Sequence, residues 1–129
     1  MPGKFLFDTN IVIEILNNKE LKFSEEQLEI SFLISIISEL ELLSGSNITA
    51  AEEAQIKELL SSILIITIDE KVKENTITIR RKYNLKLPDA IIAASAAAMN
   101  IPLVSNDKIF EKIIEVEVLT LNEFLRKPQ

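Results

Sequence analysis

The sequence contains no cysteine, no histidine and only two glycines, Gly3 and Gly45, among 129 residues. Disulfides and thiolate metal sites are therefore excluded, as are a Ser-His-Asp triad, a Cys-His pair and a histidine-rich zinc site. Two isolated glycines form neither a phosphate-binding P-loop nor a GxGxxG nucleotide fingerprint. Any chemistry must use carboxylates, hydroxyls, amides, lysines or arginines, and carboxylates are the natural ligands of hard cations such as magnesium and manganese.

Long hydrophobic runs are also missing. The most apolar run, residues 63–68, has the length of a strand and is far too short to span a bilayer. Asp8 interrupts the first apolar segment too early for a signal peptide, so we expect a cytoplasmic protein without a membrane partner. The formal net charge of −6 argues against diffuse nucleic-acid binding but allows a local basic surface.

What the sequence does contain is a regular alternation of short apolar runs with stretches of helical character. With 47% apolar residues, one domain over residues 1–129 can bury a single core. The expected strands are residues 4–7, 30–37, 63–68, 101–104 and 116–120. The expected helices are residues 9–17, 38–43, 50–61, 70–83, 87–99, 108–113 and a last one from Asn122, with a polar linking segment through Glu29. This order predicts an α/β fold of three layers, α/β/α, around a mainly parallel central sheet of four to five strands.

Four acidic residues lie where this topology places the carboxyl ends of the strands. Asp8 directly follows the first strand, Asp107 follows the fourth, and Glu41 is expected in the first turn of the helix after the second strand. These three can meet at one rim of the sheet, and Asp89 would join them from the first turn of the alanine-rich helix. The four carboxylates therefore form a candidate site.

Such a cluster of carboxylates needs compensation. Two like charges about 5 Å apart cost roughly 3 kcal/mol at an effective dielectric of 20. A divalent cation, or protonation of one acid, would relieve this repulsion. A bound cation of this kind activates water and stabilises charge on a phosphate that undergoes in-line displacement.

Each acid also has a purely structural alternative. Asp8 has the position of a helix N-cap, and Asp107 that of a turn or cap residue. Ser38 and Glu41 have the S-x-x-E spacing of a capping box, and Asp89 would favour the dipole of its own helix. The sequence leaves these alternatives open.

Residues 71–86 reverse the acidity of the chain locally, with one acid, Glu74, among six bases. Arginine and lysine contacts to phosphate give salt-sensitive, sequence-independent affinity. The candidate RNA-binding residues are Arg80, Arg81, Lys82 and Lys86. The alternative is a solvated helix face, and Tyr83 either stacks a base or covers the edge of the core.

Four fragments carry a family resemblance. They are Phe7-Asp8-Thr9-Asn10, residues 34–45, residues 87–96 and residues 103–110. In this order and at these spacings the chain resembles PIN-domain ribonucleases, most closely the VapC-type toxins of bacterial and archaeal toxin–antitoxin modules. The resemblance covers nearly the whole chain.

The resemblance implies a metal-dependent endoribonuclease that uses Mg²⁺ or Mn²⁺. Its acidic residues would be Asp8, Glu41, Asp89 and Asp107, with Asp8 and Asp89 as the surest metal ligands. The family's glutamate typically precedes a glycine by four positions, which selects Glu41 and leaves Glu39 as a weaker candidate that supports it.

The resemblance also implies supporting residues and partners. The small polar residues Thr9, Asn10 and Ser105 would orient acids or water, although the family more commonly has threonine in place of Ser105. The partners it implies are an RNA substrate, a cognate antitoxin that blocks the site, and a second copy of the chain in a homodimer. Apolar residues at 11–16 and 56–60 would serve such contacts or lie in the core.

Two other functions remain as alternatives. One is a phosphotransferase or phosphatase with Asp8 as nucleophile, as in haloacid-dehalogenase-like enzymes. Those enzymes generally have a second aspartate two positions on, where this sequence has Asn10. The other is a catalytically silent PIN-like module that binds RNA or protein, which the presence of all four acids disfavours.

Overall fold

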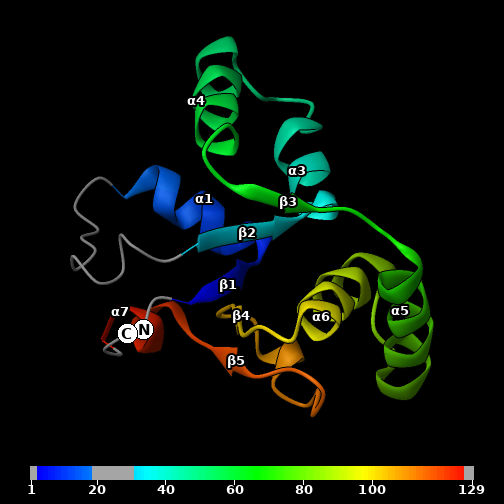
Figure 1. Cartoon of the computed structure of the whole chain (residues 1–129). Helices are drawn as coiled ribbons and strands as arrows, with labels where there is room; N and C mark the ends of the chain where they lie inside the picture. The colour runs from blue at the N-terminus through cyan, green and yellow to red at the C-terminus, as the bar shows by residue number, and fades with distance from the viewer. Residues whose placement is uncertain (1–2, 19–30, 127–129) are drawn as a thin grey trace.

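A five-stranded parallel sheet with the strand order β3-β2-β1-β4-β5 runs through the molecule (Figure 1). The computed structural model describes residues 3–18 and 31–126. The strands are β1 (Lys4–Phe7), β2 (Ser31–Ser35), β3 (Leu64–Ile66), β4 (Leu103–Val104) and β5 (Val118–Leu119). The predicted parallel sheet is confirmed.

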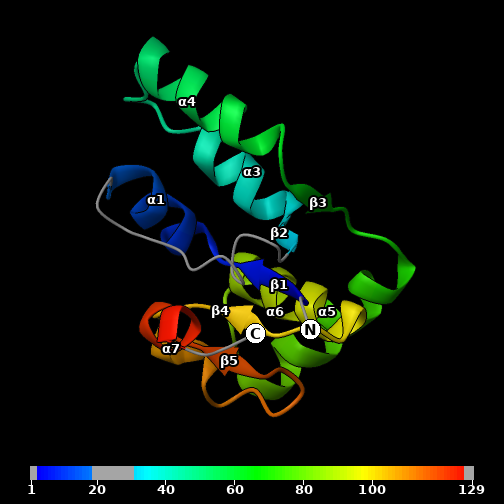
Figure 2. The same ribbon diagram turned by 60° about the vertical axis from the view of Figure 1, so that its left-hand side comes forward.

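Helices cover both faces of the sheet. Figures 1 and 2 show α5 and α6 packed side by side on one face, with α1 and α4 on the other. The helices are α1 (Thr9–Asn17), α3 (Ile36–Leu43), α4 (Ala50–Leu60), α5 (Glu70–Tyr83), α6 (Leu87–Met99), α7 (Leu121–Arg126) and the short 3-10 helix η1 (Lys108–Phe110). The three-layer α/β/α prediction is therefore confirmed.

The two faces of the sheet have separate hydrophobic cores because neighbouring strand residues point to opposite sides. Leu6, Leu33 and Leu103 pack in the core under α5 and α6. Phe7 and Ile34 pack in the other core, with side chains of α1, α3, α4 and α7. Both faces are covered, which explains why the strands appear in the sequence as continuous apolar runs.

Local capping residues fix most helix ends where the sequence predicts them. Thr49 makes a capping box at the start of α4, and Asp69 accepts a hydrogen bond from the backbone at the start of α5. Asn84 and Asn100 follow α5 and α6 with φ of 55° and 54°, a left-handed conformation that asparagine tolerates.

The predicted boundary between the second strand and its helix is wrong. β2 ends at Ser35 and not at Ile37, because the Ser35 hydroxyl accepts a hydrogen bond from the Ile37 N–H at 3.1 Å and caps α3. Glu41 consequently lies in the second turn of α3 and not in its first. The predicted linking segment through Glu29 and the predicted strand start at residue 30 lie outside the described residues.

The C-terminal part has less regular structure than predicted. The helix expected at 108–113 is one 3-10 turn, because Glu111, Ile113 and Val116 each bond back three residues in a series of tight turns. The strands β3, β4 and β5 are also shorter than predicted, and α7 begins one residue before Asn122. In the described part of the chain, no helix has both the length and the apolar character needed to cross a membrane.

Candidate functional site

A cleft of about 290 Å³ opens at the carboxyl ends of β1 and β4. The described residues that line it are Asp8, Thr9, Asn10, Ile13, Glu41, Asp89, Ile92, Asp107 and Phe110. All four acids that the sequence singles out therefore share one cleft. Four separate elements bring them there: the β1–α1 junction, α3, α6 and the loop after β4.

Asp8 is the most deeply placed of the four acids, with 4% of its surface exposed. It follows β1, and its own N–H donates to the Val104 carbonyl of β4 at 3.1 Å. Its Oδ1 accepts from the Ile11 N–H at 2.9 Å, and its Oδ2 accepts from the Ser105 hydroxyl. Asp8 is thus both the N-cap of α1 and a residue of the cleft.

Ser105 connects two of the acids. This buried hydroxyl donates to Asp8 and accepts the Asp107 N–H at 3.0 Å. Asp107 in turn accepts from the Ile109 N–H at 3.0 Å and caps η1. The hydrogen bond expected from Ser105 is present, and it fixes Asp8 relative to the loop that carries Asp107.

Glu41 is held by a chain of two hydroxyls. Thr9 Oγ1 lies 2.6 Å from Glu41 Oε1 and 2.9 Å from the Ser38 hydroxyl. Because the Thr9 hydroxyl has one proton, it donates to the nearer acceptor, the Glu41 carboxylate, and accepts from the Ser38 hydroxyl. The capping-box alternative for Ser38 and Glu41 is wrong, since Ser35 caps α3. Sequence reasoning missed Ser38 as a site residue, although its i−3 spacing from Glu41 was a usable signal.

Comparison with known families gives the identity of this arrangement. A family model for the PIN domain matches residues 5–116. The chain belongs to the PIN-domain family. Members of this family are generally nucleases.

Solved structures agree with this assignment. The PIN domain described here is similar to a toxin–antitoxin complex from Klebsiella pneumoniae, with 30% identity, a TM-score of 0.71 and coverage of 89% of this chain and 95% of that one. VapBC2 from Rickettsia felis, bound to a promoter DNA fragment, has 23% identity, a TM-score of 0.78 and coverage of 91% and 98%. DNA-bound VapBC from Salmonella typhimurium has 24% identity, a TM-score of 0.74 and coverage of 93% and 98%. A search of curated protein sequences gave no significant match.

The acids of this PIN domain repel one another. Burial raises the pKa of Asp8; the hydrogen bonds from Ser105 and Ile11 oppose the rise, while the nearby charges of Asp107 and Asp89 add to it. Burial likewise raises the pKa of Asp89, and Asp107 and Glu41 raise it further. The pKa of Asp89 is therefore raised although this residue lies in the first turn of α6, and the cleft as a whole favours cations.

The donor set of the PIN domain fits a hard divalent cation. The cleft offers carboxylate, hydroxyl and amide oxygens and no sulfur or imidazole, the ligand chemistry of magnesium and manganese. Within residues 3–18 and 31–126, no three acidic side chains are arranged closely enough to hold one ion together. Magnesium typically takes one or two carboxylates directly and keeps several waters, so direct ligation by two acids with water between the ion and the others suits this geometry.

Three other candidate site residues, Asn10, Glu39 and Lys86, lie at different places relative to the cleft. Asn10 lies exposed at the cleft, whereas Glu39 is not among the described residues that line it. Residues two positions apart on a helix point to different sides, so Glu39 faces away from the side of α3 that carries Glu41. Lys86, the N-cap residue of α6, is close enough to Asp89 to oppose the rise in its pKa.

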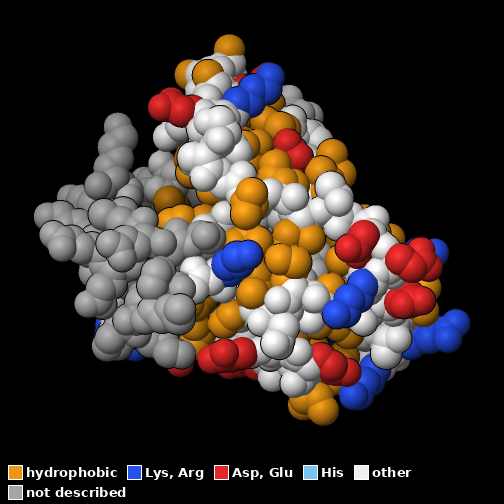
Figure 3. All heavy atoms as spheres, in the orientation of Figure 1, with side chains coloured by type: hydrophobic (Ala, Val, Ile, Leu, Met, Phe, Trp, Pro, Cys, Tyr) orange, Lys and Arg blue, Asp and Glu red, His pale blue; other side chains and the backbone are white. Residues whose placement is uncertain are grey.

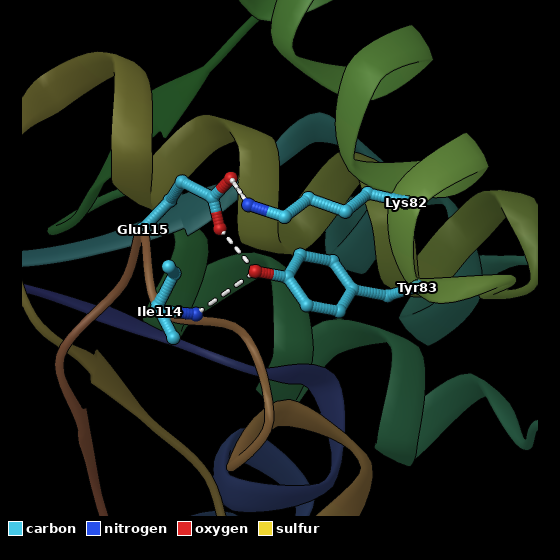
Figure 4. Close-up of polar contacts among 4 residues, drawn as sticks. All are labelled: Lys82, Tyr83, Ile114 and Glu115. Atoms are coloured by element: carbon cyan, nitrogen blue, oxygen red, sulfur yellow. Dashed lines mark hydrogen bonds and ion pairs between the residues drawn. The ribbon is translucent and has the colours of Figure 1, made fainter.

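The basic segment of the PIN domain is divided between two sides of α5. Lys82 lies 3.2 Å from Glu115, and the Tyr83 hydroxyl donates to Glu115 at 2.6 Å and accepts the Ile114 N–H at 3.2 Å (Figure 4). The Tyr83 ring packs against the core, so it covers the core edge. Figure 3 shows acidic and basic side chains side by side over α5, which is not uniformly basic on this face.

The acid cluster predicts an unusual pH dependence of stability. The raised pKa values of Asp8 and Asp89 mean that the folded chain binds protons more tightly than the unfolded chain. The two acids therefore stabilise the fold when they are protonated, and this stabilisation is lost as pH rises through their folded pKa values. In metal-free buffer, Asp89→Asn is expected to raise Tm by roughly 2–4 °C at pH 7.5 and by less at pH 4.5. Thermal unfolding followed by circular dichroism measures this difference.

The matched control is Glu58→Gln, which removes one exposed charge from α4 outside the cleft. Its Tm difference from the wild type should change little between the two pH values. A lower Tm for Asp89→Asn at pH 7.5 would contradict the repulsion described above.

Proposed function

We propose that this chain is a metal-dependent endoribonuclease that hydrolyses RNA phosphodiester bonds in the cytoplasm as the VapC-type toxin of a toxin–antitoxin pair. The convergence of Asp8, Glu41, Asp89 and Asp107 in one cleft of a PIN fold carries this proposal. The 30% identity to a chain from a toxin–antitoxin complex supports the toxin assignment.

The proposed roles follow from the contacts of each residue. Asp8 and Asp89 would hold Mg²⁺ or Mn²⁺ directly, and the bound ion would supply activated water and charge stabilisation at the phosphate. Ser105 and the Ile11 N–H keep the Asp8 carboxylate in one orientation. Glu41 and Asp107 line the same cleft, where their carboxylates would accept hydrogen bonds from water and orient it.

One assay separates the three candidate functions. Labelled single-stranded RNA, DNA of the same sequence and a small phosphomonoester are each incubated with the protein and Mn²⁺. RNA cleavage supports the nuclease. Phosphomonoester hydrolysis with a phosphate covalently bound to Asp8, found by mass spectrometry, would instead identify a phosphotransferase, and RNA binding without cleavage a silent module.

The antitoxin partner is proposed to bind a second groove, of about 510 Å³, between α1 and the α3–α4 region. Ile13 and Glu41 line both this groove and the acidic cleft, so a peptide in the groove reaches the site. Ile13 is 40% exposed, whereas Ile11 and Ile56 lie buried in the core. A homodimer is proposed from the family resemblance.

The hydroxyl chain to Glu41 predicts a defect in catalysis without a defect in binding. Thr9→Val removes the donor to Glu41, and Ser38→Ala removes the donor to Thr9. Loss of a hydrogen-bond partner that orients a residue of the metal site typically lowers activity about 10–100-fold. We therefore expect kcat to fall about 10-fold or more for Thr9→Val and less for Ser38→Ala. Steady-state cleavage of a fluorogenic RNA should show KM nearly unchanged.

Thr9→Ser is the matched control, because it keeps the hydroxyl and should retain most of the activity. Equal losses in Thr9→Val and Thr9→Ser would show that the methyl group, and not the hydrogen bond to Glu41, matters.

A further inference from the structure

A third concavity, of about 410 Å³, lies on the other side of the first turn of α6. We call it the arginine groove, and its lining includes Ile77, Arg80 and Arg81 of α5, Asn84 of the α5–α6 turn, and Leu87 of α6. No acidic side chain is among the described residues that line it. In a chain with a net charge of −6, a groove with two arginines and no acid favours an anionic ligand.

The arginine groove is next to the acidic cleft. Leu87 lines the groove and Asp89 lines the cleft, and both belong to the first turn of α6. Side chains two positions apart on a helix point roughly 200° apart, so the two cavities flank one helix end. Lys86, whose charge acts on Asp89, directly precedes this first turn and makes no side-chain hydrogen bond that caps it. An extended single-stranded ligand with one phosphate at the acidic cleft can therefore reach the arginine groove around this end of α6.

The groove combines a guanidinium that the protein holds in place with exposed apolar side chains. Arg80 Nε donates to the Leu85 carbonyl at 3.3 Å, which holds the guanidinium against the α5–α6 turn. A guanidinium has four further N–H donors, which can bind a ligand. Ile77 and Leu87 are 48% and 49% exposed, so both present apolar surface to solvent. Lys82 lies apart from this set, in its pair with Glu115.

These features match the two halves of a nucleotide. Guanidinium groups bind phosphate, and a guanidinium plane or apolar side chain covers the face of an unstacked base. We propose that the arginine groove binds a nucleotide of single-stranded RNA that flanks the scissile phosphodiester. This inference rests on the proposed ribonuclease function and adds to it the surface that holds the substrate beside the cleft.

Binding of RNA to the full chain in EDTA tests the groove without cleavage. The probe is a fluorescein-labelled single-stranded RNA of mixed sequence and about 12 nucleotides. Its binding is measured by fluorescence anisotropy at several salt concentrations. Arg81→Gln is expected to weaken binding about 10-fold and to make the salt dependence less steep by about 0.7, as expected for one lost phosphate contact. Leu87→Ser and Ile77→Ser are each expected to weaken binding about 5-fold with an unchanged salt slope.

Two matched controls lie outside the groove. Lys71→Gln removes one positive charge from the exposed surface of α5, and Leu64→Ser removes an exposed leucine from β3. Both should bind RNA within 2-fold of the wild type. Equal weakening by Lys71→Gln and Arg81→Gln would overturn the proposal, because it would show diffuse charge attraction.

The outcomes also separate the groove from the proposed function. Weakened RNA binding in the groove variants, with no RNA cleavage by the wild type in Mn²⁺, would support RNA binding by the arginine groove and refute the proposed nuclease function. RNA cleavage by the wild type, with full RNA affinity in every groove variant, would refute RNA binding by the arginine groove and leave the proposed nuclease function in place. Full RNA affinity with altered self-association of Leu87→Ser in gel filtration would show a protein contact surface and would likewise refute RNA binding by the groove.

Discussion

Asp8→Asn is expected to lower RNA cleavage by about 10²-fold or more while the chain stays folded. Asparagine has the same shape, and its Oδ1 can still accept the Ile11 N–H that caps α1. It carries no charge, however, and so removes one carboxylate ligand from the cleft. The measurements are the initial rate of RNA cleavage in Mn²⁺ and the Tm of the same preparation.

Asp69→Asn is the matched control for this prediction. Asp69 caps α5 as Asp8 caps α1, with its Oδ1 accepting the Val72 N–H at 2.9 Å, but it does not line the cleft. The same chemical change at the same type of helix position should therefore leave cleavage unchanged. Equal losses at both positions would mean that cap chemistry, and not the acidic cleft, determines activity.

Removal of divalent cations has the second large expected effect. Chelation by EDTA should reduce cleavage at least about 10²-fold, and added Mn²⁺ should restore it. The same ion should stabilise the fold, because it neutralises the carboxylates whose pKa values burial and repulsion raise. At about 100 times its Kd, a ligand stabilises by about 2.7 kcal/mol, which raises the Tm of a domain of this size by roughly 10 °C.

Thermal unfolding with and without Mn²⁺ checks the stabilisation independently of activity. The exposed-charge variant Glu58→Gln should show the full Tm increase, whereas Asp8→Asn and Asp89→Asn should show little of it. Cleavage that persists in EDTA, or an equal Tm increase in all variants, would refute a cation held by these acids.

Much of the site was predictable because its residues mark local transitions in the chain. Asp8 comes where an apolar strand turns into a helix, and Asp107 follows β4, the buried strand that pairs with β1 on the side away from β2. In a parallel sheet such positions lie at one edge, so the order of elements alone brings these acids together. The starts of α4 and α5 were predictable for the same reason, since Thr49 and Asp69 each bond to the helix that follows them.

The boundary of α3 was not predictable from the apolar pattern. Ile36 and Ile37 continue the run of β2, and only the hydrogen bond from the Ile37 N–H to Ser35 shows that the helix has begun. This shift moves Glu41 into the second turn and makes Ser38 a partner of Thr9.

The sequence by itself determined the layers, the parallel sheet and which acids can meet, because strand periodicity and helix caps act over a few neighbouring residues. Only the tertiary structure decided which side chains bond to each other across the chain. Ser105 contacts Asp8 across 97 positions, Thr9 contacts Glu41 across 32, and Lys82 pairs with Glu115 across 33. These contacts depend on strand register and helix placement, which local composition does not encode. The arginine groove likewise exists only because the end of α5 folds back against the start of α6.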